Sequence, residues 1–238
     1  MRPGGWRVWL CCAALVAGVR ISDAQNRDDA VAGKADDLIL RVGVAGGMGV
    51  SYMSMTDVVD LANATMGNYQ RLPEFKSAAE FFGAATVPVS HDWVLKLEYA
   101  YVLASYNVST TFGNGQAEYT AMAHLPSIIV QYVLLNEPVY NVKIGAGGGY
   151  HFGTLEAKFF TQDDRYSGTG PGLVLDAEGN TAFGESLYAY LGMNLRWDFI
   201  GELTNSMGMT PGVSGEGIAA TTMQFFGLGA RLGFTFYF

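Results

Sequence analysis

The first candidates for chemistry in this 238-residue chain are its three histidines. His124 lies three residues before Ser127, and a histidine beside a serine pairs a general base with a nucleophile. On a strand, residues three apart face opposite sides, so the pair meets only if a bulge at Pro126 restores the phase. His91 lies in an expected turn and His151 in an expected strand, each without a serine or acid partner at strand spacing. We therefore assign no catalytic residue and interpret all three histidines as polar filling or rim residues.

Acidic residues are the second candidates, since carboxylates bind divalent cations. The stretch 153–185 carries Asp163, Asp164, Asp176 and Glu178 among glycines. Their spacing is not that of a calcium-binding EF-hand loop, so a solvated acidic loop is the favoured interpretation. No metal site and no cofactor is expected.

The N-terminal 24 residues have the composition of a signal peptide. Two arginines precede an apolar core of about a dozen residues, and "SDA" stands before Gln25. The core is shorter than the ~20 residues of a spanning helix. The only cysteines, Cys11 and Cys12, lie in this segment, so the mature chain is expected to hold no disulfide and no thiolate site.

The rest of the chain divides into a short lead and one domain. Residues 25–37 are polar without periodicity and predict a disordered lead, and residues 38–238 form the domain. Removal of the first 24 residues takes away three of 14 basic and one of 22 acidic residues. The strong acidity that remains argues against nucleic acid as a partner.

Period-two alternation of apolar and small or polar residues dominates the domain and predicts strands. Only 15% of residues are charged, and 31 are glycine. Eight strands are expected, of which the seventh is weak, over 38–50, 79–89, 93–103, 119–135, 140–152, 187–199, 202–209 and 224–238.

The connections between these runs alternate in length. Tight turns are expected around "SHD", "NEP" and "IG", and long connections over 55–77, 107–117, 153–185 and 210–219. Within the first long connection, Thr56 as a cap and Asp57 in the first turn predict a short helix. Short turns at one end and long loops at the other are typical of an all-β, eight-stranded antiparallel up-and-down transmembrane barrel, with periplasmic turns and extracellular loops.

Size decides which face of the closed sheet points outward. Eight strands leave an interior just wide enough for side chains, so the bulky apolar face must meet lipid. Aromatic residues at the edges of this face are expected to form girdles: Trp93, Tyr140, Tyr150, Trp197 and Phe199, with Trp197 and Phe199 near the short turns. Charged residues on the other face would be costly unless paired, which predicts an ion-pair network in the lumen: Arg41, Glu80, Lys96, Glu98, Lys143, Arg196, Asp198, Glu202 and Arg231. A selectivity ring in a pore is the alternative use of these charges.

The last residues, "GARLGFTFYF", resemble the C-terminal strand by which the barrel-assembly machinery recognises bacterial outer-membrane proteins. Phe234, Phe236 and Phe238 stand at the positions of this assembly signal. The chain resembles the OmpA-like, OmpX-like and OmpW-like small barrel families, and "HLPSIIVQY" is similar to a strand of OmpW-type barrels. The resemblance implies an outer-membrane location, with lipid and lipopolysaccharide around the barrel.

Three functions remain open at this point. The first is a monomeric barrel with a filled lumen that serves envelope structure or surface interaction through its loops. The second is an OmpW-type channel for small or hydrophobic solutes. The third is a lipid-modifying enzyme, since His124 and Ser127 are similar to the pair used by lipid A deacylase barrels.

Overall fold

The computed structural model describes residues 41–65, 72, 75–109, 116–137, 139–159, 162–211 and 221–238. These residues form eight strands and one helix. In chain order they are β1 (Gly43–Ser54), α2 (Thr56–Thr65), β2 (Phe75–Pro88), β3 (Trp93–Ser109), β4 (Gln116–Asn136), β5 (Tyr140–Phe159), β6 (Gln162–Ala182), β7 (Leu187–Glu202) and β8 (Thr222–Tyr237).

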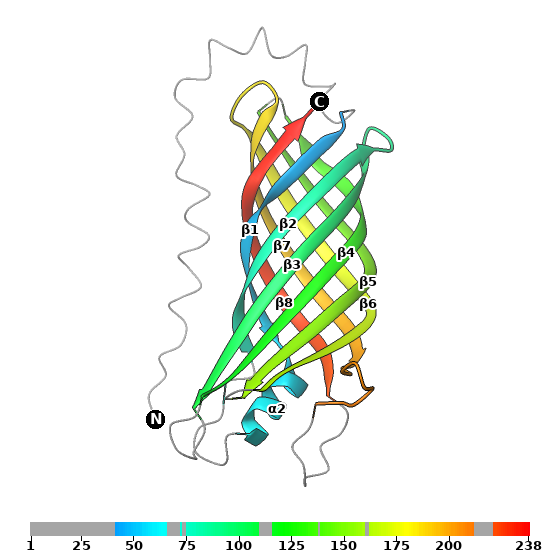
Figure 1. Ribbon diagram of the computed structural model, residues 1–238. Coiled ribbons are helices and arrows are strands. Elements are labelled where there is room, and N and C mark those ends of the chain that lie inside the picture. Colours follow the sequence, from blue (N-terminus) through cyan, green and yellow to red (C-terminus); the bar gives the residue numbers. More distant parts are fainter. Residues whose placement is uncertain are drawn as a thin grey trace, which may run out of the picture.

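The strands form one closed antiparallel barrel in which each strand pairs with its neighbours in the sequence. The ring closes between β1 and β8, where Gly43 pairs with Tyr237 and Ser54 with Phe226. The strands are strongly tilted, and α2 lies at the end opposite the C terminus (Figure 1). Closure leaves no edge strand along the ring, and it confirms the predicted eight-stranded up-and-down fold.

Side chains alternate between lumen and exterior along every strand. In β8 the alternation continues almost unbroken, with exposed apolar residues from Phe226 to Phe236 on one face and buried residues such as Arg231 on the other. Trp93, Leu97 and Tyr99 of β3 point outward in the same way, while Lys96 and Glu98 point inward. The apolar face is therefore the outer face, as the narrow interior predicted.

The prediction of a long loop over 153–185 was wrong. β5 continues to Phe159 and β6 fills most of this stretch, pairing with β5 from Gln162 to Thr181. β6 lacks a clear alternating signature because its inward residues are charged or amidic (Asp176, Glu178, Asn180) and many of its outward residues are small. Of the acids that indicated a solvated loop, Asp176 and Glu178 face the lumen from β6, whereas Asp163 and Asp164 are exposed.

The expected weak strand over 202–209 and the expected turn around "IG" were also wrong. β7 runs through Ile200 to Glu202, and Thr204 makes a single isolated bridge to Ser167. The following residues form a turn in which the Asn205 side chain accepts hydrogen bonds from the backbone N–H groups of Met207 and Met209, both 2.9 Å. The count of eight strands holds because β6 takes the place of this segment.

Pro126 causes no bulge. The register of β4 against β3 is continuous through the pairs Glu98↔Ser127 and Tyr99↔Pro126. His124 and Pro126 consequently face outward and Ser127 faces the lumen. The irregularity in β4 lies instead between Val133 and Leu135.

The predicted short helix is confirmed as α2. Its apolar residues Val58, Val59, Leu61 and Ala62 are buried against the lumen-facing side chains at this end of the barrel. Asp57 in its first turn accepts hydrogen bonds from the backbone N–H and the hydroxyl of Thr222 at the start of β8. Within the described ranges, no helix is long and apolar enough to cross a membrane.

Three sequence predictions fall outside the described residues. These are the signal peptide at 1–24, the lead at 25–37, and most of the connection at 210–219.

Candidate functional site

The lumen brings charges from six strands into one network, and Arg231 of β8 is at its centre. Its Nε donates to Glu80 Oε1 at 3.0 Å and its Nη1 to Glu98 Oε2 at 2.8 Å. β1 places Gly49 between Arg231 and Glu80, since Gly49 is the register partner of both. A Cβ at this position would meet the carbonyl oxygen of Ala230 and lie 3.0 Å from Arg231 Cγ, so the glycine leaves room for the two side chains to meet across β1.

Lys96 of β3 reaches across the lumen to the acidic residues of β6. Its Nζ lies 3.2 Å from Glu98, 2.9 Å from Asp176 and 2.8 Å from Glu178. Glu178 in turn lies 2.7 Å from Nζ of Lys143. The two acids of β6 thus bind lysines from β3 and β5, although the sequence had placed them in a loop.

The network is electrically balanced among the described residues. Arg196 pairs with Glu98, which brings the set to four cations and four carboxylates, all at most 5% exposed. Buried charges are tolerated only when paired and hydrogen-bonded. Within the described ranges, some polar atoms of the network have no hydrogen-bond partner, among them Nε and Nη1 of Arg196 and Oδ1 of Asp176.

A second polar group lies beside this network. His151 of β5 contacts Asp198 of β7 through Nδ1 and Ser127 Oγ of β4 through Nε2, the latter at 3.2 Å. All three side chains are buried. His151 has no serine or acid partner at strand spacing, as the sequence indicated; its partners come from strands far apart in the sequence. Asp198 belongs to this group rather than to the main network.

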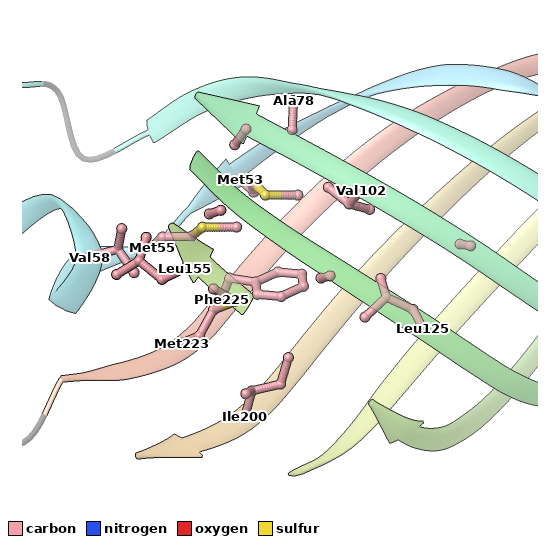
Figure 2. Close-up of a cluster of buried hydrophobic side chains, with 14 of the residues drawn as sticks. Met53, Met55, Val58, Ala78, Val102, Leu125, Leu155, Ile200, Met223 and Phe225 are labelled. Atoms are coloured by element: carbon pink, nitrogen blue, oxygen red, sulfur yellow. The ribbon is translucent and has the colours of Figure 1, made fainter. Parts of the chain in front are cut away.

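Apolar residues fill the lumen toward α2. Figure 2 shows Met53, Met55 and Met223 together with Leu125, Leu155 and Phe225, beside Val58 of the helix. We call Met53, Met55, Leu125, Leu155, Ile200, Met223 and Phe225, together with the buried alanines between them, the apolar plug. At the other end, a small cavity of about 10 Å³, room for roughly one water molecule, is lined by Arg41, Thr86, Asn141, Lys143 and Tyr237.

Besides Asp198, two residues of the predicted lumen network lie outside it. Arg41 precedes β1 and lines the small cavity, and it joins none of the ion pairs among the described residues. Glu202 is exposed at the last position of β7. Both were assigned from strand phase alone, which gives the face of a residue but not its height in the barrel. The prediction was wrong for these two.

Asp176 and Glu178 were not predicted as network members, nor were Ser127 and His151 predicted as partners. A recognisable signal existed only for His151, whose phase in β5 placed it inside. Finding the others required the position of β6 and the register of β4.

The outer face carries the predicted aromatic residues, but at two different levels. Trp93 and Tyr140 lie at the short-turn end, where Trp93 packs against Tyr132 with ring centroids 5.1 Å apart. Phe234, Phe236 and Phe238 also point outward near this end. Tyr150, Trp197 and Phe199 lie toward the long-loop end, which corrects the placement of the last two near the short turns. The reason is that β7 begins, rather than ends, at a tight turn.

Polar residues follow these aromatic residues toward the long loops. On the outer face of β5, Phe152 is followed by Thr154, Glu156 and Lys158, and Glu156 lies 4.0 Å from Arg165 of β6. On β5 the outer face therefore changes from apolar at Phe152 to charged at Glu156, four residues further along the strand.

No family model matches the chain, and no curated protein matches it either. Among solved structures it is similar to Neisserial surface protein A (NspA), with 11% identity and a TM-score of 0.48, covering 83% of this chain and 97% of that one. It is also similar to the outer membrane protein OprG from Pseudomonas aeruginosa (15%, 0.44, 83% and 95%). A third is the outer membrane protease OmpT from Escherichia coli (8%, 0.44, 83% and 97%).

Proposed function

We propose that this chain is an integral barrel of the bacterial outer membrane whose lumen is closed, and that it serves envelope structure or surface interaction through its long-loop end. The observation that carries the proposal is the height of the outward apolar band. From Tyr140 to Phe152 it covers twelve steps along β5. At ~3.3 Å per residue and a tilt near 45°, this is roughly 28 Å, close to the hydrocarbon thickness of a bilayer.

The two fillings of the lumen support a closed barrel. Along its length a solute would meet the apolar plug and then the balanced ion pairs around Arg231. A conducting pore needs a continuous water path with weakly held charges. In this lumen each charged side chain of the network is held in an ion pair with another buried charge.

The proposal includes export by a signal peptide over residues 1–24 and recognition of Phe234, Phe236 and Phe238 by the assembly machinery. Lipid and lipopolysaccharide then surround a monomer. Support for the assembly signal comes from the exposure of these three rings at the end of β8.

Planar-bilayer recording of the purified chain tests closure. We expect no discrete conductance, and reproducible single-channel steps would contradict the closed lumen and favour the OmpW-type channel. Heat-modifiable migration in gels tests the barrel itself. A monodisperse product in the absence of detergent would contradict the membrane location.

Assembly in cells tests the terminal signal. Phe238→Ala is expected to reduce the folded, heat-modifiable fraction. Phe183→Ala is the matched control, because Phe183 is an equally exposed ring in a turn at the same end of the barrel. Equal loss for both variants would contradict a specific role of the C-terminal residue.

A further inference from the structure

The group formed by Ser127, His151 and Asp198 has the contacts of a nucleophile, its base and the acid that orients the base. With the ring proton on Nδ1, His151 donates to Asp198 and its Nε2 accepts from the serine hydroxyl. This is the arrangement used in serine acyl transfer, and it is recognised by geometry rather than by sequence order. His124, the histidine that the sequence favoured for such a pairing, faces outward and contacts Tyr99 instead.

A buried histidine would also need two partners without any chemistry, so further features must distinguish the two roles. Glycines face the imidazole ring and leave the space that it occupies. A Cβ at Gly149 would lie 2.9 Å from Nε2 of His151, and a Cβ at Gly172 would meet both the ring and Asp198. Among the described residues, His151 is the one ionisable partner of Asp198, and Asp198 Oδ2 has no hydrogen-bond partner there. A structural role for the histidine does not explain this second carboxylate oxygen.

A donor for developing negative charge lies in the same layer. Arg196 is two residues from Asp198 on the lumen face of β7, and it pairs with Glu98, the cross-strand neighbour of Ser127. Its Nε and Nη1 hydrogens have no partner among the described residues. Preorganised donors of this kind stabilise the oxyanion of acyl transfer.

The position of the group indicates the class of substrate. Toward the long-loop end, the next lumen-facing neighbours of the three residues are Leu125, Gly153 and Ile200, and a Cβ at Gly153 would lie 2.6 Å from Met223 Sδ. The apolar plug therefore begins directly beside the serine. Toward the other end lies the ion-pair network, so the group occupies the boundary between an apolar and a charged compartment.

From this placement we propose that Ser127 is a nucleophile for carboxylic esters with an apolar acyl chain, which enters from the α2 end and must displace methionines of the plug. Ser127 Oγ attacks the carbonyl carbon while its proton passes to His151 Nε2. The C–O bond to the alcohol then breaks, and the alcohol leaves with that proton. Water hydrolyses the acyl-serine by the same route, giving the acid and restoring Ser127. Asp198 is a positioning residue that holds the imidazole.

Labelling with an alkyl fluorophosphonate, located by peptide mass spectrometry, tests the proposal on the full chain folded in detergent micelles. We expect label on Ser127 and a loss of at least ~100-fold in labelling rate for His151→Asn, the scale of general-base contributions. Ser51 is the matched control, because it is a buried lumen serine bonded to a carboxylate, Glu80, without a histidine. It should remain unlabelled, and Ser51→Ala should not change labelling of Ser127.

Access and positioning are tested separately. Asp57→Ala, which removes the hydrogen bonds between α2 and Thr222, should accelerate labelling of Ser127. Asp198→Asn should lose labelling while Asp198→Glu retains part of it, with heat-modifiable migration intact in both. Failure to label Ser127 in both wild type and Asp57→Ala would overturn the proposal, as would labelling that is unchanged in His151→Asn. Hydrolysis of p-nitrophenyl octanoate should follow the same order of variants.

Discussion

The two halves of the lumen are closed in different ways. Toward α2 the lumen is filled by the packed side chains of the apolar plug, with flexible methionines among small residues. Toward the short turns, the lumen is filled by four cations and four carboxylates that pair with one another. Packing losses in the first half should be graded, because neighbours can partly relax. Loss of one member in the second half leaves an opposite charge buried without compensation, so the response should be abrupt.

The largest effect is expected for Arg231→Met. It leaves Glu80 and Glu98 without their central cation, and breaking a buried ion pair from one side costs about 3–5 kcal/mol. Urea unfolding in detergent, followed by the heat-modifiable gel shift, measures the change in free energy. Arg165→Met is the control on the exterior, where the pair with Glu156 is largely exposed and a change within about 0.5 kcal/mol is expected. Similar values for both variants would contradict the dominant role of the central arginine.

Leu125→Ala is the corresponding test of the apolar plug. Leu125 is fully buried, and truncation of such a leucine costs roughly 2–4 kcal/mol depending on how far the cavity collapses. The same unfolding measurement applies, with Leu173→Ala on the outer face as control. If Leu125→Ala had no larger effect than Leu173→Ala, the plug would be loosely packed rather than a core.

Gly49→Ala tests whether the network depends on the absence of a side chain at position 49 of β1. Its Cβ would meet the carbonyl of Ala230 and the stem of Arg231, and overpacking of this kind costs about 1–3 kcal/mol. Gly83→Ala is the matched control, since a Cβ there meets nothing within 4 Å. Equal stability of the two variants would mean that Arg231 can reach Glu80 by another route.

The smallest effect is expected for Asp57→Ala, which should cost about 1 kcal/mol through lost hydrogen bonds to Thr222. Hydrogen exchange should rise within α2, and Asp60→Ala, an exposed substitution on the same helix, should leave it unchanged. Conductance should stay absent, because the ion-pair half remains filled. Current through Asp57→Ala barrels would mean that the helix alone closes the lumen.

Strand phase explains which parts of this molecule could be predicted from the sequence. Alternation placed Lys96 and Glu98 inside and Trp93 and Tyr99 outside, and it indicated a closed barrel because the apolar face was too bulky for its interior. β6 could not be found in this way, since acids on its inner face and small residues on its outer face erase the alternation.

The partners across the lumen could not be predicted for a different reason. Which charges meet depends on strand order, register and height together. Ser127, His151 and Asp198 come from β4, β5 and β7, and no local spacing connects them. Glu202 shows the same limit, because it was assigned to the start of a strand over 202–209 and instead ends β7 as an exposed residue.

The ion pair between Arg231 and Glu80 joins residues 151 positions apart, across the seam where the first and last strands meet. A chain that has formed β1 to β7 but not docked β8 holds four lumen carboxylates and only three of their cations. The charge balance is therefore completed by the final step of assembly. Until β8 docks, one lumen carboxylate therefore lacks its cation, and closure of the barrel removes this imbalance.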